Sequence, residues 1–268
     1  MMRVWNTVAE WVERRRALNG RSIGFVPTMG ALHRGHASLA ERCRRENEIV
    51  VVSIFVNPSQ FNDPNDLERY PRTLGSDLAL LDGLGVDEVF APAASEMYPY
   101  GYRFRVEADG VKVMEGAHRP GFLEGVMTVV LKLLNIVRAD RAYFGEKDYQ
   151  QLETISGMVK EFFISTEIVL CPTVREGSGL AESSRNALLS AAARDKAAFL
   201  YRALTAAASS NEARSMLEAE GLAVEYVEEH WGRRFAAAFL DGVRLIDNVP
   251  LSEKAMETER WCHGPFKA

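Results

Sequence analysis

Two histidines three residues apart, His33 and His36, stand in the segment VPTMGALHRGH at residues 26–36. The apolar residues 23–26 predict a short buried strand, and Pro27 and Gly30 predict a turn that opens a helix carrying both imidazoles on one face. A helix N-terminus presents unpaired N–H groups to phosphate, and imidazoles can donate to phosphate oxygens as their charge grows. Gly35 has no side chain, so an adenine ring can lie against its backbone. The segment therefore favours a nucleoside triphosphate site.

Two other interpretations of the histidine pair remain open at this point. Helices supply such pairs by chance, so both side chains can lie on an ordinary helix surface. A zinc site would need a third ligand, which Cys43 offers about two turns further along the same predicted helix.

Neutral amides follow the most apolar strand candidate of the chain, IVVVSIFV at residues 49–56. Asn57 and Gln60 can orient a polar substrate without adding charge, and Phe61 can supply an apolar wall beside them. The alternative is that both amides only cap the loop.

A third polar motif, GEKDYQQ, follows the strand candidate at residues 141–144. Lys147 can neutralise phosphate, Asp148 can accept from ribose hydroxyls, and Gln151 on the next helix can point back to the same crevice. The alternative is a capping turn with a surface ion pair.

A loop rich in glycine and serine marks a change of character after Cys171 and Pro172. Within it, Ser183, Ser184 and Arg185 form a candidate mobile phosphate clamp. Ser183 is also a candidate helix N-cap, and the two roles are compatible.

Composition narrows the class of protein. The chain has 268 residues, 47% of them hydrophobic, and a net charge of −5, which disfavours a general nucleic-acid binder. No apolar run approaches the roughly 18 residues of a membrane span, so no membrane partner is expected. Three scattered cysteines (Cys43, Cys171 and Cys262) suggest no disulfide framework and favour a reducing, cytoplasmic location. No GxGxxG after a strand, GxxxxGK[ST] or GxSxG motif is found.

The alternation of strand and helix predicts an α/β protein with a Rossmann-like, doubly wound parallel sheet. Strands are expected at 23–26, 49–56, 88–91, 141–144 and 167–170, and helices at 5–18, 36–46, 77–84, 126–137 and 149–162. A smaller C-terminal α+β domain should hold one long helix at 191–220 and strands near 222–228, 234–240 and 243–247. The predicted domains are residues 1–173, catalytic, and 174–268.

Taken together, these motifs resemble the pantothenate synthetase (pantoate–β-alanine ligase) family of the HxGH nucleotidylyltransferase superfamily. The matching segments are VPTMGALHRGH, VSIFVNPSQF, YPRT, TVVLKLLNIVRADRAYFGEKDYQQL, PTVREGSGLAESSRN and RLIDN. The resemblance implies that the pantoate carboxylate attacks the α-phosphate of ATP, giving pantoyl adenylate and pyrophosphate. β-Alanine then displaces AMP to give pantothenate, for coenzyme A biosynthesis. It also implies Mg²⁺, a C-terminal domain that acts as a lid, and a homodimer.

The resemblance also assigns roles to residues. His36, His33, Lys147 and Arg185 would be catalytic. ATP would be bound by Met29, Gly30, Ala31, Leu32, His33, Arg34, Gly35, His36, Gly145, Glu146, Lys147, Asp148, Val174, Glu182, Ser183, Ser184 and Arg185. Pantoate and β-alanine would be bound by Pro27, Asn57, Gln60, Phe61, Arg119 and Gln151, and Asp77 would help hold the metal through water.

Four positions depart from the family pattern. Phe122 replaces a usual histidine, so that a polar contact near Arg119 should be lost, and Ser178 replaces an aspartate, which should loosen its loop. Glu182 adds negative charge beside Ser183 and Ser184. Gly75-Ser76 stands before Asp77 where the family commonly has an acidic residue, so fewer acidic groups should surround the metal. Two rival functions stay open: a nucleotidylyltransferase of the same fold that acts on a phosphorylated alcohol, and a nucleotide-binding regulator without catalysis, which Phe122 and Glu182 would favour.

Overall fold

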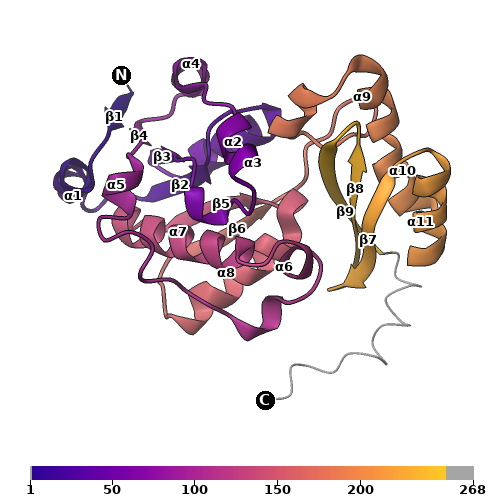
Figure 1. The fold of residues 1–268 in the computed structure, drawn as a ribbon. Coiled ribbons are helices and arrows are strands. Elements are labelled where there is room, and N and C mark those ends of the chain that lie inside the picture. The colour runs from indigo at the N-terminus through magenta and orange to yellow at the C-terminus, as the bar shows by residue number, and fades with distance from the viewer. Residues whose placement is uncertain (1, 252–268) are drawn as a thin grey trace. The chain divides into compact units, whose positions relative to one another are not determined.

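The computed structural model describes residues 2–251 (Figure 1). The chain separates into two compact units, residues 1–172 and 173–268. The boundary predicted between residues 173 and 174 differs from this division by one residue. Cys262 lies outside the described residues, so the structure does not address its state.

The first unit is built on a parallel six-stranded sheet with the order β1-β4-β3-β2-β5-β6. Its strands are β1 (Arg3–Trp5), β2 (Ile23–Thr28), β3 (Ile49–Ile54), β4 (Glu88–Phe90), β5 (Arg141–Gly145) and β6 (Glu167–Cys171). The chain winds outward from β2 through β3 to β4, then returns to add β5 and β6 on the other side of β2. The carboxyl ends of β2 and β5 thus flank the point where the winding reverses, which is where such sheets bind ligands.

Helices cover both faces of this sheet, which confirms the predicted doubly wound class (Figure 1). The helices are α1 (Val8–Ala17), α2 (Arg34–Glu46), α3 (Pro64–Arg69), α4 (Leu74–Gly83), α5 (Ala94–Met97), α6 (Glu115–His118), α7 (Phe122–Val137) and α8 (Tyr149–Glu161). Alternate strand residues face opposite ways, so Phe25 and Val51 pack with α1, α7 and α8, whereas Val26 and Val52 pack with α2 and α4.

Helix α2 lies very close to β2 because Gly24 has no side chain. A Cβ at Gly24 would stand 2.3 Å from Cys43 Sγ, a separation that no real structure tolerates. Cys43 is fully buried in the core between these elements. In the part of the chain that the structure describes, no three histidine, cysteine or acidic side chains gather as a metal site, so the zinc interpretation has no support there.

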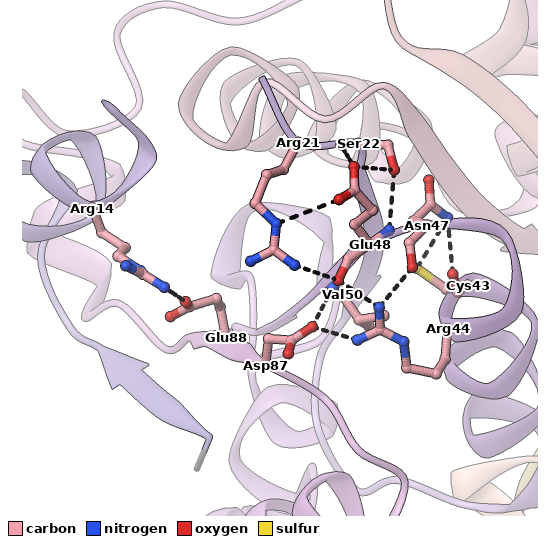
Figure 2. A network of polar contacts seen from close by, with 10 residues as sticks. All are labelled: Arg14, Arg21, Ser22, Cys43, Arg44, Asn47, Glu48, Val50, Asp87 and Glu88. Atoms are coloured by element: carbon pink, nitrogen blue, oxygen red, sulfur yellow. Dashed lines mark hydrogen bonds and ion pairs between the residues drawn. The ribbon is translucent and has the colours of Figure 1, made fainter. Parts of the chain in front are cut away.

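The amino-terminal end of the sheet carries an ionic network (Figure 2). The buried Glu88 carboxylate accepts from Arg14 of α1 at 2.6 Å and from Trp5 Nε1 at 2.7 Å. Asp87 accepts from Arg44 of α2 and, at 2.8 Å, from the backbone N–H of Val50. These contacts attach α1 and α2 to the amino-terminal end of the sheet, opposite the end that carries the polar motifs.

Several predicted helix starts in the first unit were wrong. Residue 5 ends the edge strand β1 and does not start a helix; α1 begins at Val8, after Thr7 has closed a capping box with Glu10. Trp5, Val8, Trp11 and Val12 have helical spacing, so the pattern placed residue 5 in the helix that follows it. Helices α4 and α7 each begin earlier than predicted, at Leu74 and Phe122.

The second unit has an antiparallel sheet in the order β7-β8-β9, packed against helices, as the predicted α+β class requires (Figure 1). Its elements are α9 (Ala191–Ala197), α10 (Phe199–Ala206), α11 (Ser210–Ala219), β7 (Ala223–His230), β8 (Arg233–Leu240) and β9 (Val243–Pro250). The single helix predicted at 191–220 is wrong. Ala207 is extended, and Ser209 caps α11 by accepting from the N–H of Glu212 at 3.2 Å.

None of the helices within residues 2–251 combines the length and apolar character needed to cross a membrane.

Candidate functional site

The turn after β2 is held in an unusual backbone conformation. Gly30 and Ala31 have φ values of 82° and 51°, so two successive residues lie in the left-handed region that side chains disfavour. The buried Asp77 carboxylate accepts from the N–H groups of Ala31 at 3.0 Å and Leu32 at 2.9 Å. The hydroxyl of Thr73 adds a third donor at 3.1 Å. Asp77 therefore holds the turn, a structural role beyond its predicted help in holding the metal through water.

The two histidines form a reciprocal capping arrangement at the start of α2. His33 is the N-cap with an extended backbone, so the prediction that it lies on the helix face was wrong. Its Nδ1 accepts from the N–H of Gly35 at 3.1 Å, and Nδ1 of His36 accepts from the N–H of His33 at 3.4 Å. The ring centroids are 4.1 Å apart. Because each Nδ1 is an acceptor, the proton of each neutral ring sits on Nε2, which is left to donate.

Electrostatics keep both rings neutral. Burial, together with the positive charge of Lys147, lowers the pKa of His33 to about 4, while Asp148 opposes this shift. Burial, then His33 and Lys147, lower the pKa of His36 to about 3. A cation that perturbs both rings must lie near them, so the ends of the adjacent strands β2 and β5 bring the two motifs together.

Lys147 belongs to the short 3₁₀ helix η3 (Glu146–Asp148), which directly follows Gly145 at the end of β5. Its side chain is mostly buried, and its Nζ lies 3.7 Å from Asp148 Oδ1. The ion pair of the alternative interpretation is therefore present, but it lies beside the imidazoles.

The amide pair after β3 divides into two different roles. Asn57 is 1% exposed, and its side chain is bonded to Gln60, Gly125, Ser59 and Tyr98 within the protein. It is thus committed to the protein and not available to a substrate, which corrects its predicted binding role. Asn57 stands at the N-cap position of the following 3₁₀ helix but makes no side-chain capping hydrogen bond, so the capping interpretation has no support. Gln60 in η1 (Pro58–Gln60) accepts from Asn57 and keeps its own NH₂ group without a partner in the described residues.

Aromatic and cationic side chains surround Gln60. Phe61 packs edge-on against Tyr70, with ring centroids 5.6 Å apart. Arg119 donates to the backbone oxygen of Gln60 at 3.4 Å, and its guanidinium lies 3.7 Å above the ring of Phe122. Phe122 thus meets Arg119 through cation–π stacking, in place of the polar contact that a histidine could supply.

Two further predicted residues lie on neighbouring elements. Pro27 lies on β2 opposite Ser53 of β3, and Gln151 lies, half-buried, in the first turn of α8. Its neighbour Gln150 points elsewhere, with its amide bonded to the backbone of Glu115 and Val113.

A pocket of about 370 Å³ adjoins the turn on the β3–β4 side. Met29, Gly30 and Asp77 line one part of it, and Phe55 and Leu74 line another. The turn is thus backed partly by open space, and packing alone does not fix its position.

The predicted clamp lies in the second unit. Ser183 caps the 3₁₀ helix η4 (Ser184–Leu188) by accepting from the N–H of Arg185 at 3.3 Å, so its capping role applies to η4 and not to the long helix that was predicted. The N–H of Glu182 donates to the oxygen of Val174 at 3.0 Å. These contacts order the backbone that carries the clamp residues.

The preceding loop is tied to the sheet of its own unit. Arg175 binds the buried carboxylate of Asp247 at 2.6 and 3.0 Å and stacks on Tyr201. Ser178 Oγ accepts from the N–H of Leu180 at 3.4 Å, so the loop closes through its own hydrogen bonds. The expectation that Ser178 loosens the loop finds no support in these contacts. The partnership with Asp247 explains why RLIDN accompanies the other motifs.

Comparisons with known proteins agree with this geometry. The family model described as pantoate-beta-alanine ligase matches residues 1–250. The pantothenate synthetase of Bdellovibrio bacteriovorus is 50% identical over 94% of this chain and 100% of its own length, and that of Legionella pneumophila is 49% identical over 93% and 100%.

Two solved structures are similar to this chain over most of its length. The pantoate-beta-alanine ligase of Francisella tularensis, complexed with beta-gamma ATP and beta-alanine, has a TM-score of 0.89 and 42% identity, over 93% of this chain and 98% of that one. The pantothenate synthetase of Thermus thermophilus has a TM-score of 0.87 and 45% identity, over 93% and 99%.

Proposed function

The chain belongs to the pantoate–β-alanine ligase family and condenses pantoate with β-alanine using ATP, and we propose that it does so through pantoyl adenylate at the carboxyl ends of β2, β3 and β5. One observation carries the proposal: two neutral imidazoles, the Lys147 ammonium and the Gln60 amide lie at the ends of three adjacent strands. Donors for phosphate and an uncharged group for a polar acid thus share one edge of the sheet.

In the first step a pantoate carboxylate oxygen attacks the α-phosphorus of ATP, and the bond to pyrophosphate breaks. His33 and His36 donate from Nε2 to the phosphate oxygens, and Lys147 offsets their growing charge. The adenine lies against Gly35 and the ribose near Asp148. Residues Met29–His36 and Gly145–Asp148 form the nucleotide site of the first unit.

In the second step the amine of β-alanine attacks the acyl carbonyl, and AMP leaves. Gln60 donates from its NH₂ group to pantoate and helps place β-alanine, and Gln151 binds the pantoate hydroxyls. Arg119 and Phe61 complete this part of the site. Alignment of the reactants and stabilisation of phosphate charge suffice, so no covalent nucleophile on the protein is needed.

The second unit serves as a lid that supplies Ser183, Ser184 and Arg185 to the triphosphate, with Val174 and Glu182 beside the nucleoside. Mg²⁺ enters bound to ATP. Both oxygens of Asp77 are engaged by backbone N–H groups, which does not fit a direct metal ligand, and the described residues hold no other cluster suited to a metal. The protein acts as a cytoplasmic homodimer.

The test is pyrophosphate release from ATP and Mg²⁺, with and without pantoate and β-alanine. Pantoate-dependent release that becomes catalytic and yields AMP when β-alanine is added would establish both steps. A phosphorylated alcohol in place of pantoate tests the nucleotidylyltransferase alternative. ATP binding without any release would leave a nucleotide-binding regulator and would refute the ligase mechanism.

A further inference from the structure

We propose that Tyr98 is a positioning residue for the acid substrates, acting through Asn57 on the amide of Gln60. Tyr98 follows α5 and lies 41 residues from Asn57, so no local motif connects them. The inference rests on the proposed role of Gln60 in binding pantoate and β-alanine.

One hydrogen-bond partner of Asn57, a backbone carbonyl, can only accept a hydrogen bond. The backbone oxygen of Gly125 on α7 accepts from Asn57 Nδ2 at 3.2 Å. A carbonyl offers no donor, so this contact fixes which end of the Asn57 amide is NH₂ and which is oxygen. The same Nδ2 donates to Gln60 Oε1 at 3.0 Å. Gln60 is thereby forced to turn its oxygen to Asn57 and its NH₂ group away, as a donor.

Tyr98 completes the other end of Asn57. Asn57 Oδ1 accepts from the Tyr98 hydroxyl at 2.7 Å and from the Ser59 hydroxyl at 3.0 Å. With two donors and two acceptor positions in use, the Asn57 amide has no capacity left and cannot rotate without breaking a buried bond. The two hydroxyls also lie 3.1 Å apart, within hydrogen-bond distance of each other.

The frame around this chain of amides is rigid. A Cβ at Gly125 would stand 2.4 Å from the backbone oxygen of Ser59, so glycine lets α7 press directly on η1. Tyr98 is 6% exposed, with Lys132 Nζ 4.2 Å from its ring centroid and the tilted ring of Tyr102 at a centroid distance of 4.3 Å. Burial raises the pKa of Tyr98 above its ordinary value, so the hydroxyl keeps its proton.

Tyr98→Phe and Tyr102→Phe form a matched pair for the test. Each removes one hydroxyl, but Tyr102 is 50% exposed and its hydroxyl makes no hydrogen bond among the contacts that the structure describes. Loss of one buried hydrogen bond should raise KM for pantoate and β-alanine by about threefold to tenfold in Tyr98→Phe. KM for ATP should stay near wild type and the melting temperature should fall by only about 2–4 °C, the shift that corresponds to a loss near 1 kcal/mol. Tyr102→Phe should behave as wild type throughout.

A third variant tests whether Asn57 sets the orientation of the Gln60 amide. Asn57→Asp places acceptors where Asn57 has donors, so Gln60 should turn its NH₂ group inward and present oxygen to the substrate. KM for pantoate should then rise further than in Tyr98→Phe, by roughly thirtyfold or more, while ATP binding, followed separately by calorimetry, persists.

The outcomes separate this inference from the proposed function. If wild-type protein shows no pantoate-dependent pyrophosphate release, the proposed function fails and this inference fails with it. If wild type is active and Tyr98→Phe matches Tyr102→Phe, only this inference is overturned. An equal rise in KM for ATP and for pantoate in Tyr98→Phe would also overturn it, because that pattern indicates general loss of structure.

Discussion

Replacing Asp77 by asparagine should displace the turn at residues 29–32, which is proposed to bind ATP. The substitution alters no residue that is predicted to touch phosphate. The carboxylate accepts from the N–H groups of Ala31 and Leu32 at 3.0 and 2.9 Å. An asparagine has one acceptor oxygen, so its NH₂ group must face one of these two donors. That donor is partly buried and loses its partner, while Ala31 still has to hold a left-handed φ of 51°.

The size of the effect follows from these contacts. A hydrogen bond to a charged group contributes about 1.5–3 kcal/mol, and an unsatisfied buried donor costs a comparable amount. Losing one such bond, weakening the other and leaving the Ala31 strain uncompensated should favour a displaced turn by about 2–4 kcal/mol. The pocket of about 370 Å³ beside Gly30 and Met29 gives the turn room to move. We expect kcat/KM for ATP to fall by roughly thirtyfold to a thousandfold.

The assay is pyrophosphate release as ATP and Mg²⁺ are each varied to saturation. If Asp77 holds the turn, the defect in Asp77→Asn persists at saturating Mg²⁺, and Thr73→Val, which removes the third donor, gives a smaller defect of the same kind. Thr73→Ser keeps the hydroxyl and should resemble wild type. Full recovery of Asp77→Asn at high Mg²⁺ would refute this reasoning and return Asp77 to a metal-binding role.

Three other substitutions and one pH titration test the histidines, the stacking on Phe122 and the ion pair of Glu88. His36→Ala should slow adenylate formation by about a hundredfold to a thousandfold while the fold survives, as stopped-flow pyrophosphate release and circular dichroism would show. The folded-state pKa values of His36 and His33 are about 3 and 4, below the ordinary value near 6.5, so the unfolded chain binds more protons between these values. Stability should therefore rise from pH 4 to 6.5 in urea titrations, and kcat/KM, which reports the free enzyme, should show no ionisation of these two histidines between pH 5 and 8. Phe122→Leu removes the ring beneath Arg119 and should raise KM for pantoate by about twofold to tenfold, whereas an unchanged KM would deny the stacking any role. Glu88→Ala breaks a buried ion pair at the amino end of the sheet and should cost about 3–5 kcal/mol in denaturant unfolding with all KM values unchanged.

Much of the first unit could be predicted because its signals are local. The run IVVVSIFV is apolar on both faces, as β3 requires, and polar motifs directly follow β2, β3 and β5. Edge strand β1 has three residues, too few for a period to emerge, and pairs with β4 more than 80 positions away. The alanine-rich stretch reads as one helix by propensity, although S-x-x-E at Ser209 and Glu212 is a capping signal that could have divided it.

The site shows a similar division. Residue types that suit phosphate or a polar acid were recognisable in HRGH, NPSQ and GEKD, since each motif is contiguous. What Asn57 and Asp77 do was not recognisable, because a side chain's role depends on which partners surround it. Both belong to types that bind ligands elsewhere, and here both are used up by contacts within the protein.

Acceptor-only and donor-only backbone groups set the polarity of this site. The Gly125 carbonyl forces the orientation of Asn57 and then of Gln60, and the N–H groups of Ala31 and Leu32 require the Asp77 carboxylate. Backbone groups carry no sequence identity, so such constraints leave no motif. A chain could keep every residue of HRGH and still present a displaced turn if Asp77 changed, and it could keep Gln60 and still present an inverted amide if Asn57 changed. For that reason the substitutions Asp77→Asn and Asn57→Asp test the mechanism more sharply than removal of the residues proposed to touch the substrates.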